Sequence, residues 1–266
     1  MDLEKLAKKV LEISSSASKA VMAVYDSGDI NQENKDDGSP LTEADLNSNR
    51  IICDGLKGIQ LDMPILSEEH SVEADLSINT FWLVDPLDGT KEFLNRNGEF
   101  SVNIALILNN SPVLGIVQAP AIDEVYLGMA EIGAFKIKSK SKERISSIPM
   151  TKDLCRIVVS RSHQSSKDTR LIRMAGRNFK KVELLKAGSS LKLCRVAEGL
   201  ADVYPRLGPT YQWDIAAGQA VLEAAGGEVR ALNGNRLSYI FNRDQLNPEF
   251  LALGNKVEDW QPLLIK

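Results

Sequence analysis

The chain contains 266 residues, of which 43% are hydrophobic and 26% are charged, and its formal net charge is −4. These proportions are ordinary for a globular protein and exclude a disordered, collagen-like or coiled-coil chain. The acidic balance disfavours a general nucleic-acid binder, whose surface would be basic. The two histidines disfavour a multi-histidine zinc site, and three cysteines without a C-x-x-C spacing indicate reduced thiols in a cytosolic protein.

The N-terminal quarter of the chain predicts two helices. Apolar residues between Leu3 and Val24 recur at helical spacing, which predicts an amphipathic helix ending near Gly28. Thr42 is suited to be the N-cap of a second helix that ends near Gly58. No uninterrupted apolar run has the length of a signal-peptide core or of a membrane span.

The rest of the chain changes from strands to alternating strands and helices. Short β-rich runs between residues 81 and 138 predict a mainly antiparallel sheet, followed by a solvated basic hairpin and connection at 136–150. Strand-like and helix-like segments alternate after residue 154, which favours a layered α/β unit. We therefore expect two fused lobes, an α+β lobe at residues 1–145 and an α/β lobe at 146–266.

The most informative segment reads WLVDPLDGTKEF. An apolar strand ends at Asp85, Pro86 turns the chain, and Asp88 is expected to point back toward the same place. Gly89 permits close approach of the backbone, and Thr90 adds a hydroxyl. Two crowded carboxylates favour either a raised pKa or a bound cation, and hard oxygen ligands suit Mg²⁺. The alternative interpretation is an Asx-rich turn at a strand end.

Three known motifs fail at this segment or elsewhere in the chain. An EF-hand loop is excluded because Leu87 and Gly89 stand at ligand positions. A haloacid-dehalogenase motif is excluded because Pro86 stands where its nucleophilic aspartate would be. Cys155 and Arg161 have the spacing of a cysteine phosphatase, but the β-branched residues between them cannot form a phosphate-binding nest of N–H groups.

Four further acidic residues each have an ordinary structural explanation. Glu68 and Glu69 follow an apolar strand and could be a surface or capping pair. Asp214 precedes an alanine-rich helix and could be its N-cap, and Asp45 could complete a capping box with Thr42. Taken together, however, these residues form an ordered pattern along the chain.

The series Asp45, Glu68-Glu69, DPLDGT and WDIAA resembles the signature of the lithium-sensitive, Mg²⁺-dependent phosphomonoesterases of the inositol monophosphatase superfamily. The blocks SEEH, FWLVDPLDGTKEFLNRNGEFSVNIALI, VVSRSH, GSSLK, VAEGLADVYPRLGPT and WDIAAG extend the resemblance, over nearly the whole chain, to the CysQ-type 3′(2′),5′-bisphosphate nucleotidases. The resemblance implies a layered sandwich that combines α+β and α/β parts, with its layers in the order αβαβα. It also implies hydrolysis of adenosine 3′,5′-bisphosphate to AMP, or of 3′-phosphoadenylyl sulfate to adenylyl sulfate, in sulfur metabolism.

The same resemblance implies a role for each site residue. It places two or three Mg²⁺ ions on Glu68, Asp85, the Leu87 carbonyl, Asp88 and Asp214. It assigns activation of the attacking water to Asp45 and Thr90, with Glu69 steadying metal-bound water. It implies that the N–H groups of Gly89 and Thr90 bind the scissile phosphate. It also implies that the nucleotide and its second phosphate are bound by His163, Ser189, Lys192 and Arg206. Ser189 and Lys192 are expected on one side of a helix near its N-terminus.

Three alternatives and the setting of the protein remain open at this point. An inositol monophosphatase or a fructose 1,6-bisphosphatase would share the metal ligands, and a metal or nucleotide sensor would lack turnover. We expect a small nucleotide bisphosphate as partner, no nucleic acid, and a cytoplasmic protein; peripheral association with the inner membrane, found in some relatives, stays open. Ala231 and Arg236 replace an Asp and a Pro common in relatives, but both lie away from the motifs.

Overall fold

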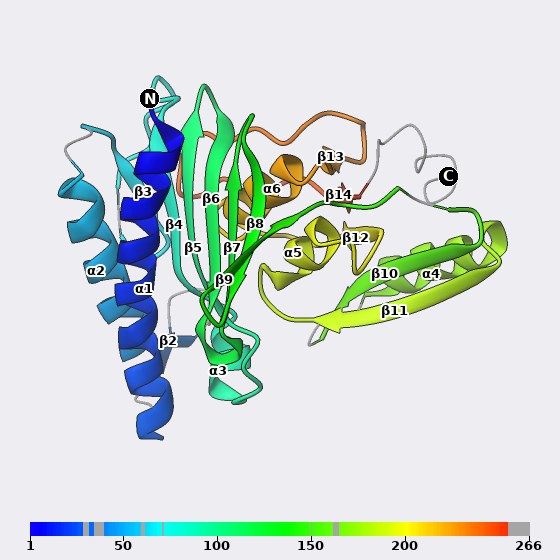
Figure 1. Cartoon of the computed structure of the whole chain (residues 1–266), viewed down its shortest axis with the longest axis horizontal. Coiled ribbons are helices and arrows are strands. Elements are labelled where there is room, and N and C mark those ends of the chain that lie inside the picture. The colour runs from blue at the N-terminus through cyan, green and yellow to red at the C-terminus, as the bar shows by residue number, and fades with distance from the viewer. Residues whose placement is uncertain are drawn as a thin grey trace.

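The computed structural model in Figure 1 describes residues 1–28, 32–34, 40–59, 62–70, 72–149, 151–161 and 165–254. Two long helices lie side by side at one end of the molecule, α1 (Leu3–Ser27) and α2 (Glu43–Lys57). They are followed along the chain by two sheets and four shorter α-helices. In this described part, no helix is long and apolar enough to cross a membrane.

The ends of the first two helices follow from local chemistry. The Asp2 side chain accepts a hydrogen bond from the N–H of Lys5 at 3.1 Å and caps α1, which ends at Gly28 in the left-handed region, with φ 75°. Thr42 precedes α2, and Gly58 follows it. Both predicted helices are confirmed. A two-stranded hairpin, β1 (Gln32–Asn34) and β2 (Pro40–Thr42), lies between them.

The larger sheet has seven strands in the order β3 to β9. Its members are β3 (Ile65–Ser67), β4 (Phe81–Asp88), β5 (Ser101–Leu108), β6 (Ser111–Ala119), β7 (Glu124–Met129), β8 (Gly133–Lys138) and β9 (Ser141–Ile145). β3 is parallel to β4 and the remaining pairs are antiparallel, so the predicted antiparallel sheet is confirmed. Two short helices, α3 (Thr90–Leu94) and the 3₁₀ helix η1 (Pro120–Ile122), follow β4 and β6.

The smaller sheet has five strands in the order β11-β10-β12-β14-β13. Its elements and the helices among them are β10 (Leu154–Ser160), α4 (Ser166–Asn178), β11 (Lys181–Ala187), α5 (Leu191–Ala197), β12 (Val203–Arg206), α6 (Ala216–Ala224), β13 (Glu228–Ala231) and β14 (Phe250–Leu253). β10 is parallel to β11 and β12, whereas β14 is antiparallel to β12 and β13. The predicted alternation is confirmed, and β14 is an additional strand that the pattern did not indicate.

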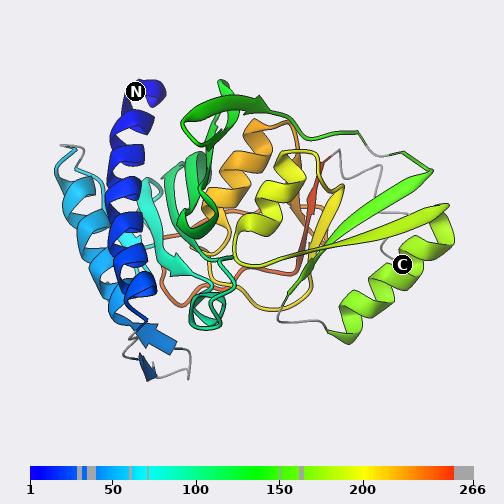
Figure 2. The same ribbon diagram turned by 60° about the horizontal axis from the view of Figure 1, so that its bottom comes forward.

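The elements form five layers, as Figures 1 and 2 show: α1 and α2, the seven-stranded sheet, α5 and α6, the five-stranded sheet, and α4. α6 lies close on the larger sheet because two glycines face it. A Cβ on Gly115 would stand 2.3 Å from the Ala217 carbonyl oxygen, and one on Gly128 would stand 2.5 Å from the Ala220 carbonyl oxygen. The predicted layered fold is confirmed. The division into lobes at residue 145 stays a prediction, because one core cluster contains residues of both sheets.

Candidate active site

The turn at the end of β4 holds the first group of predicted site residues. Asp85 is buried, and its Oδ1 accepts a hydrogen bond from the N–H of Leu87 at 3.1 Å. The Leu87 carbonyl in turn accepts the hydroxyl of Thr90 at 3.3 Å. Gly89 has φ 86°, and the sheet register shifts between Asp85 and Asp88. The turn therefore presents Asp85, Asp88 and Thr90 from one short segment, as its sequence predicts.

Two neighbouring segments are fixed against this turn by hydrogen bonds. The hydroxyl of Ser48 on α2 donates to the Pro86 carbonyl at 2.7 Å. The N–H of Glu68 donates to the Val84 carbonyl at 3.1 Å, because β3 runs parallel to β4. The Glu68-Glu69 turn therefore lies beside the residue that precedes Asp85.

Asp45 occupies the capping position that was the alternative to a catalytic role. Its Oδ2 accepts hydrogen bonds from the Thr42 N–H at 2.8 Å and from the Thr42 hydroxyl at 2.6 Å. Asp45 is buried although it is charged. The capping box is thus confirmed, and the catalytic dyad of Asp45 with Thr90 stays a prediction.

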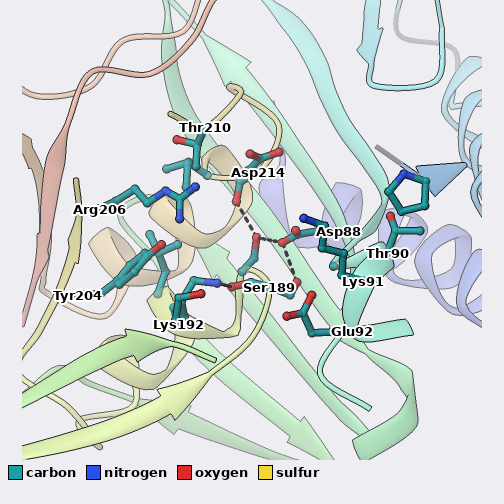
Figure 3. Close-up of a pocket in the computed structure, with 16 residues that line it drawn as sticks. Asp88, Thr90, Lys91, Glu92, Ser189, Lys192, Tyr204, Arg206, Thr210 and Asp214 are labelled. Atoms are coloured by element: carbon teal, nitrogen blue, oxygen red, sulfur yellow. Dashed lines mark hydrogen bonds between the residues drawn. The ribbon is translucent and has the colours of Figure 1, made fainter. Parts of the chain in front are cut away.

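A hydrogen-bonded group joins the end of β4 to the loop before α5, as the dashed lines in Figure 3 show. Oδ2 of Asp88 accepts the hydroxyls of Ser189 at 2.6 Å and Ser190 at 2.8 Å. The Ser190 hydroxyl also lies 2.6 Å from the backbone carbonyl oxygen of Asp214. The amide of Asn103 contacts the same Ser190 oxygen at 2.9 Å. These contacts place Asp88 and Asp214, 126 positions apart in the sequence, in one site.

Asp214 is not the N-cap of the following helix, which corrects that alternative. α6 begins at Ala216, and the Asp214 side chain points back, where its Oδ2 accepts the N–H of Tyr211 at 3.0 Å. Burial raises the pKa of Asp214 well above its usual range, and the negative charges of Asp88 and Glu68 raise it further. The three carboxylates therefore repel one another across a shared space.

This electrostatic arrangement fits a hard divalent cation. Across the described residues, no three His, Cys, Asp or Glu side chains meet closely enough to form a metal cluster by themselves. A cation between Asp88, Asp214 and Glu68 would relieve the repulsion among their charges. The donors are carboxylate oxygens, which Mg²⁺ prefers. The five-ligand set with Asp85 and the Leu87 carbonyl stays a prediction.

Two cationic side chains face the acidic ones across the same cavity (Figure 3). Lys192 lies on α5, and its Nζ donates to the Ser189 carbonyl at 2.5 Å. Arg206 ends β12 and donates to the Pro209 carbonyl at 2.7 Å, while its Nε is buried without a hydrogen bond among the described residues. The pKa of Lys192 is lowered, chiefly by burial. The charge of Asp88 opposes this shift, and the charge of Arg206 adds to it. An anion between the two cations would stabilise both.

The helix expected to carry both Ser189 and Lys192 is shorter than predicted. α5 begins at Leu191, so Ser189 lies in the preceding turn, in the left-handed region with φ 49°. The glycine before it, Gly188, leaves room for the Glu99 carbonyl oxygen, which would stand 2.8 Å from an added Cβ. The tight packing of this turn, rather than helical spacing, brings Ser189 to Asp88.

The cavity has a volume of about 380 Å³. Seven predicted site residues line it: Asp88, Gly89, Thr90, Ser189, Lys192, Arg206 and Asp214. Five other predicted site residues are not among the residues that line it, namely Asp45, Glu68, Glu69, Asp85 and Leu87. The predicted nucleotide contact His163 lies outside the described residues.

Sequence reasoning missed three residues of the site. Ser190 and Asn103 connect Asp88 with Asp214, and Tyr204 forms an aromatic wall beneath Lys192, with its ring centre 5.6 Å from Nζ. The repeated serine in GSS was the only signal for Ser190. Asn103 stands opposite Asp85 on β5, which the pairing of the strands reveals but the sequence does not.

The comparison with known families decides the classification. The family model described as "Inositol monophosphatase family" matches residues 2–261. The chain belongs to this family. The expected resemblance is thereby confirmed, and the acidic site lies in a protein whose family consists of metal-dependent phosphatases.

Individual members of the family resemble the chain over nearly its whole length. The 3′(2′),5′-bisphosphate nucleotidase CysQ of Salmonella typhimurium is 41% identical over 248 residues, which are 92% of this chain and 98% of the relative. CysQ of Escherichia coli K12 is 42% identical over 245 residues, 91% of this chain and 97% of that protein. The crystal structure of CysQ from Bacteroides thetaiotaomicron superposes with a TM-score of 0.81 at 36% identity and covers 94% of this chain and 97% of its own.

Proposed function

We propose that this protein is a Mg²⁺-dependent 3′(2′),5′-bisphosphate nucleotidase. Its reaction is the hydrolysis of the 3′-phosphate of adenosine 3′,5′-bisphosphate to give AMP and phosphate, with 3′-phosphoadenylyl sulfate as a second substrate that gives adenylyl sulfate. The identity of 41–42% with nucleotidases of this name, over nearly the full length of both chains, supports the proposal. A role in sulfur metabolism follows from the same likeness.

One observation about the cavity carries the proposal: Asp88 and Asp214 line one part of it, and Lys192 and Arg206 line the part opposite them. Asp88 and Asp214 suit a metal-bound phosphate, and Lys192 and Arg206 suit a second phosphate that no metal neutralises. A substrate with a single phosphate would leave the two cations without a phosphate to bind. The polarity of the site therefore favours a bisphosphate over inositol monophosphate.

A second hollow, which adjoins the first cavity at Arg206, supports a substrate with a nucleobase. It has a volume of about 500 Å³ and shares Ser160, Tyr204 and Arg206 with the first cavity. Its other walls include Val158, Leu207 and further apolar residues of β10 and the loop after β12. Aromatic and aliphatic walls suit a nucleobase better than the polyhydroxylated sugar of fructose 1,6-bisphosphate.

The proposed roles of the acidic residues follow the family pattern and fit the contacts in this chain. When bound, two or three Mg²⁺ ions would neutralise the phosphate oxygens and lower the pKa of the attacking water. The ions would be held by Glu68, Asp85, the Leu87 carbonyl, Asp88 and Asp214. Ser189 and Ser190 would orient the Asp88 carboxylate. Glu69 would accept a hydrogen bond from water at the metals.

The remaining residues would position the substrate and move one proton. Asp45 would accept the proton of the attacking water through the Thr90 hydroxyl, and Thr90 lines the cavity. The N–H groups of Gly89 and Thr90 would donate to the scissile phosphate, while Lys192, Arg206 and Ser189 would hold the second phosphate. His163 would contact the nucleotide. We further infer a cytoplasmic enzyme whose partner is this small nucleotide rather than a nucleic acid.

The experiment that tests this function is a phosphate-release panel. Purified protein receives adenosine 3′,5′-bisphosphate, 3′-phosphoadenylyl sulfate, inositol 1-phosphate or fructose 1,6-bisphosphate, each with Mg²⁺ or with a chelator. The proposal expects the fastest release from the two nucleotides and none without Mg²⁺. Preference for inositol phosphate or the sugar bisphosphate would contradict the assignment, and tight nucleotide binding without turnover would indicate a sensor.

A further inference from the structure

A third cavity, separate from the active-site cavity and from the hollow beside it, lies between α2, β3 and the segment at Phe241. Its volume is about 780 Å³, twice that of the active-site cavity, and no residue that the structure describes lines both cavities. The lining residues are Asn49, Arg50, Cys53, Lys57, Asp62, Met63, Pro64, Ile65, His70, Val72 and Phe241. This volume is ample for a small organic molecule.

The floor of this cavity is apolar and held in place by the core. Met63, Ile65, Val72 and Phe241 supply aliphatic and aromatic surface. Phe241 is buried and packs edge-on against the buried ring of Phe81, with ring centres 5.3 Å apart. Its carbonyl accepts the N–H of Asp75 at 3.0 Å, which fastens the segment after Val72 to it. The floor is therefore a preformed surface rather than a gap between mobile side chains.

One wall of the cavity is a single face of α2. This wall is formed by Asn49, Arg50, Cys53 and Lys57. They are one, three and four residues apart in turn, so they lie on one side of the helix over about two turns. The Asn49 side-chain oxygen accepts the hydroxyl of Ser67 at 2.7 Å and the Cys53 thiol at 3.4 Å. These contacts join the helical wall to β3.

The rim of the cavity carries more positive than negative charge. Arg50 and Lys57 lie on α2, His70 follows β3, and Asp62 is the single acidic residue among the described residues of the lining. In the described part of the chain, neither Arg50 nor Lys57 forms an ion pair, whereas Arg156, Arg195 and Arg236 are all paired with carboxylates. Two cations that outnumber the one acidic residue of the described rim, at the mouth of an apolar cavity, are complementary to an anion that has an apolar body.

We propose that this cavity is a second ligand site, for a small organic anion whose apolar body lies on Ile65, Val72 and Phe241 and whose charged group meets Arg50 and Lys57. His70 also lines the cavity. None of its described lining residues belongs to the proposed phosphatase site.

The test uses the fluorescent probe 1-anilinonaphthalene-8-sulfonate, which joins an apolar aromatic body to one sulfonate. We expect saturable binding of one probe per chain, weakened about tenfold in the R50A/K57M double variant because charge-assisted hydrogen bonds are lost. The matched control, K8M/K9M on the exposed face of α1, should bind as the wild type does. N-phenyl-1-naphthylamine, which lacks the sulfonate, should bind all of these proteins equally.

Cys53 provides a second readout at the site itself. Cys155 and Cys194 are fully buried, so iodoacetamide should alkylate Cys53 first, at alkaline pH because burial raises the pKa of its thiol. Mass spectrometry should show that the probe slows this alkylation, and that adenosine 3′,5′-bisphosphate with Mg²⁺ does not. Unchanged probe affinity in R50A/K57M, or alkylation of Cys53 at the same rate with saturating probe, would overturn the proposal. Equal melting temperatures of the variants and wild type exclude misfolding as the cause.

Discussion

The hydroxyl of Ser190 lies 2.8 Å from Oδ2 of Asp88. The Ser190 hydroxyl oxygen also lies 2.6 Å from the backbone carbonyl oxygen of Asp214, so this one small side chain connects the two halves of the acidic site. Because a hydroxyl has one proton, it can donate to only one of these acceptors at a time. Asn103, which donates to Ser190 at 2.9 Å, keeps that oxygen in place between them.

Removing this hydroxyl should reduce activity without removing a metal ligand. We expect Ser190→Ala to lower kcat/KM by about 10- to 100-fold, the range typical for residues that orient metal ligands. Raising the Mg²⁺ concentration should restore part of the loss. Ser16→Ala, at an exposed serine of α1, is the control and should keep wild-type rates. A Ser190→Ala enzyme with unchanged Mg²⁺ dependence would show that the bridge does not orient Asp88.

Asp88→Asn should abolish phosphate release but spare the fold. The amide oxygen can still accept the hydroxyls of Ser189 and Ser190, while the charge that raises the pKa of Asp214 is lost. In the presence of a chelator the variant should therefore melt no lower than the wild type. Thermal unfolding with and without Mg²⁺, next to Asp54→Asn on the exposed side of α2, checks this. A rate equal to that of the wild type would refute the proposed metal site.

The basic side of the cavity should determine recognition of the second phosphate. Lys192→Met should raise KM for adenosine 3′,5′-bisphosphate by about 10- to 100-fold, because a charge-assisted contact is lost. KM for adenosine 3′-monophosphate, which lacks the second phosphate, should change little. Steady-state kinetics on both substrates make the comparison, with Lys186→Met at an exposed position of β11 as control. Equal effects on both substrates would place Lys192 at the scissile phosphate instead.

A buried ion network should control stability in acid. Burial by itself raises the pKa of Glu124, but contacts with Lys136, Arg195 and Lys138 outweigh it and lower that pKa to about 2. A carboxyl whose pKa is lowered by folding stabilises the protein above its unfolded pKa, near 4.5, and this contribution is lost as the pH falls toward 2.

The difference in unfolding free energy between wild type and Glu124→Gln should therefore be large above pH 4.5 and shrink toward pH 2. Urea unfolding across this range measures it, with Glu143→Gln on the exposed hairpin as control. A difference that is independent of pH would mean that the ionised form of Glu124 contributes nothing.

Lithium should inhibit the enzyme. The family resemblance implies a metal position that admits Li⁺, and the carboxylates around Asp88 and Asp214 would supply its oxygen ligands. Phosphate release is measured with LiCl replacing NaCl at constant ionic strength, so that general salt effects cancel. Full activity in tens of millimolar LiCl would contradict this expectation.

Local pattern was sufficient for much of the fold. Most elements were predicted from two signals: apolar residues at helical spacing with Thr42 and Gly28 at helix ends, and β-rich runs separated by turn residues. These signals are local because capping and side-chain periodicity act over a few residues. The strand β14 was missed because its four buried apolar residues, Phe250–Leu253, are too few to show a period. The αβαβα order came from the family resemblance rather than from this pattern.

The sequence by itself determined which carboxylates are grouped on the turn from Asp85 to Asp88, because proline, glycine and an Asx contact shape that turn locally. Only the tertiary structure decided that Ser190 and Asn103 join Asp214 to Asp88, and that Lys192 and Arg206 face them. These relationships join residues of both sheets and of the helices between them. They depend on how the layers pack, and residue order along the chain does not encode such contacts in any local pattern.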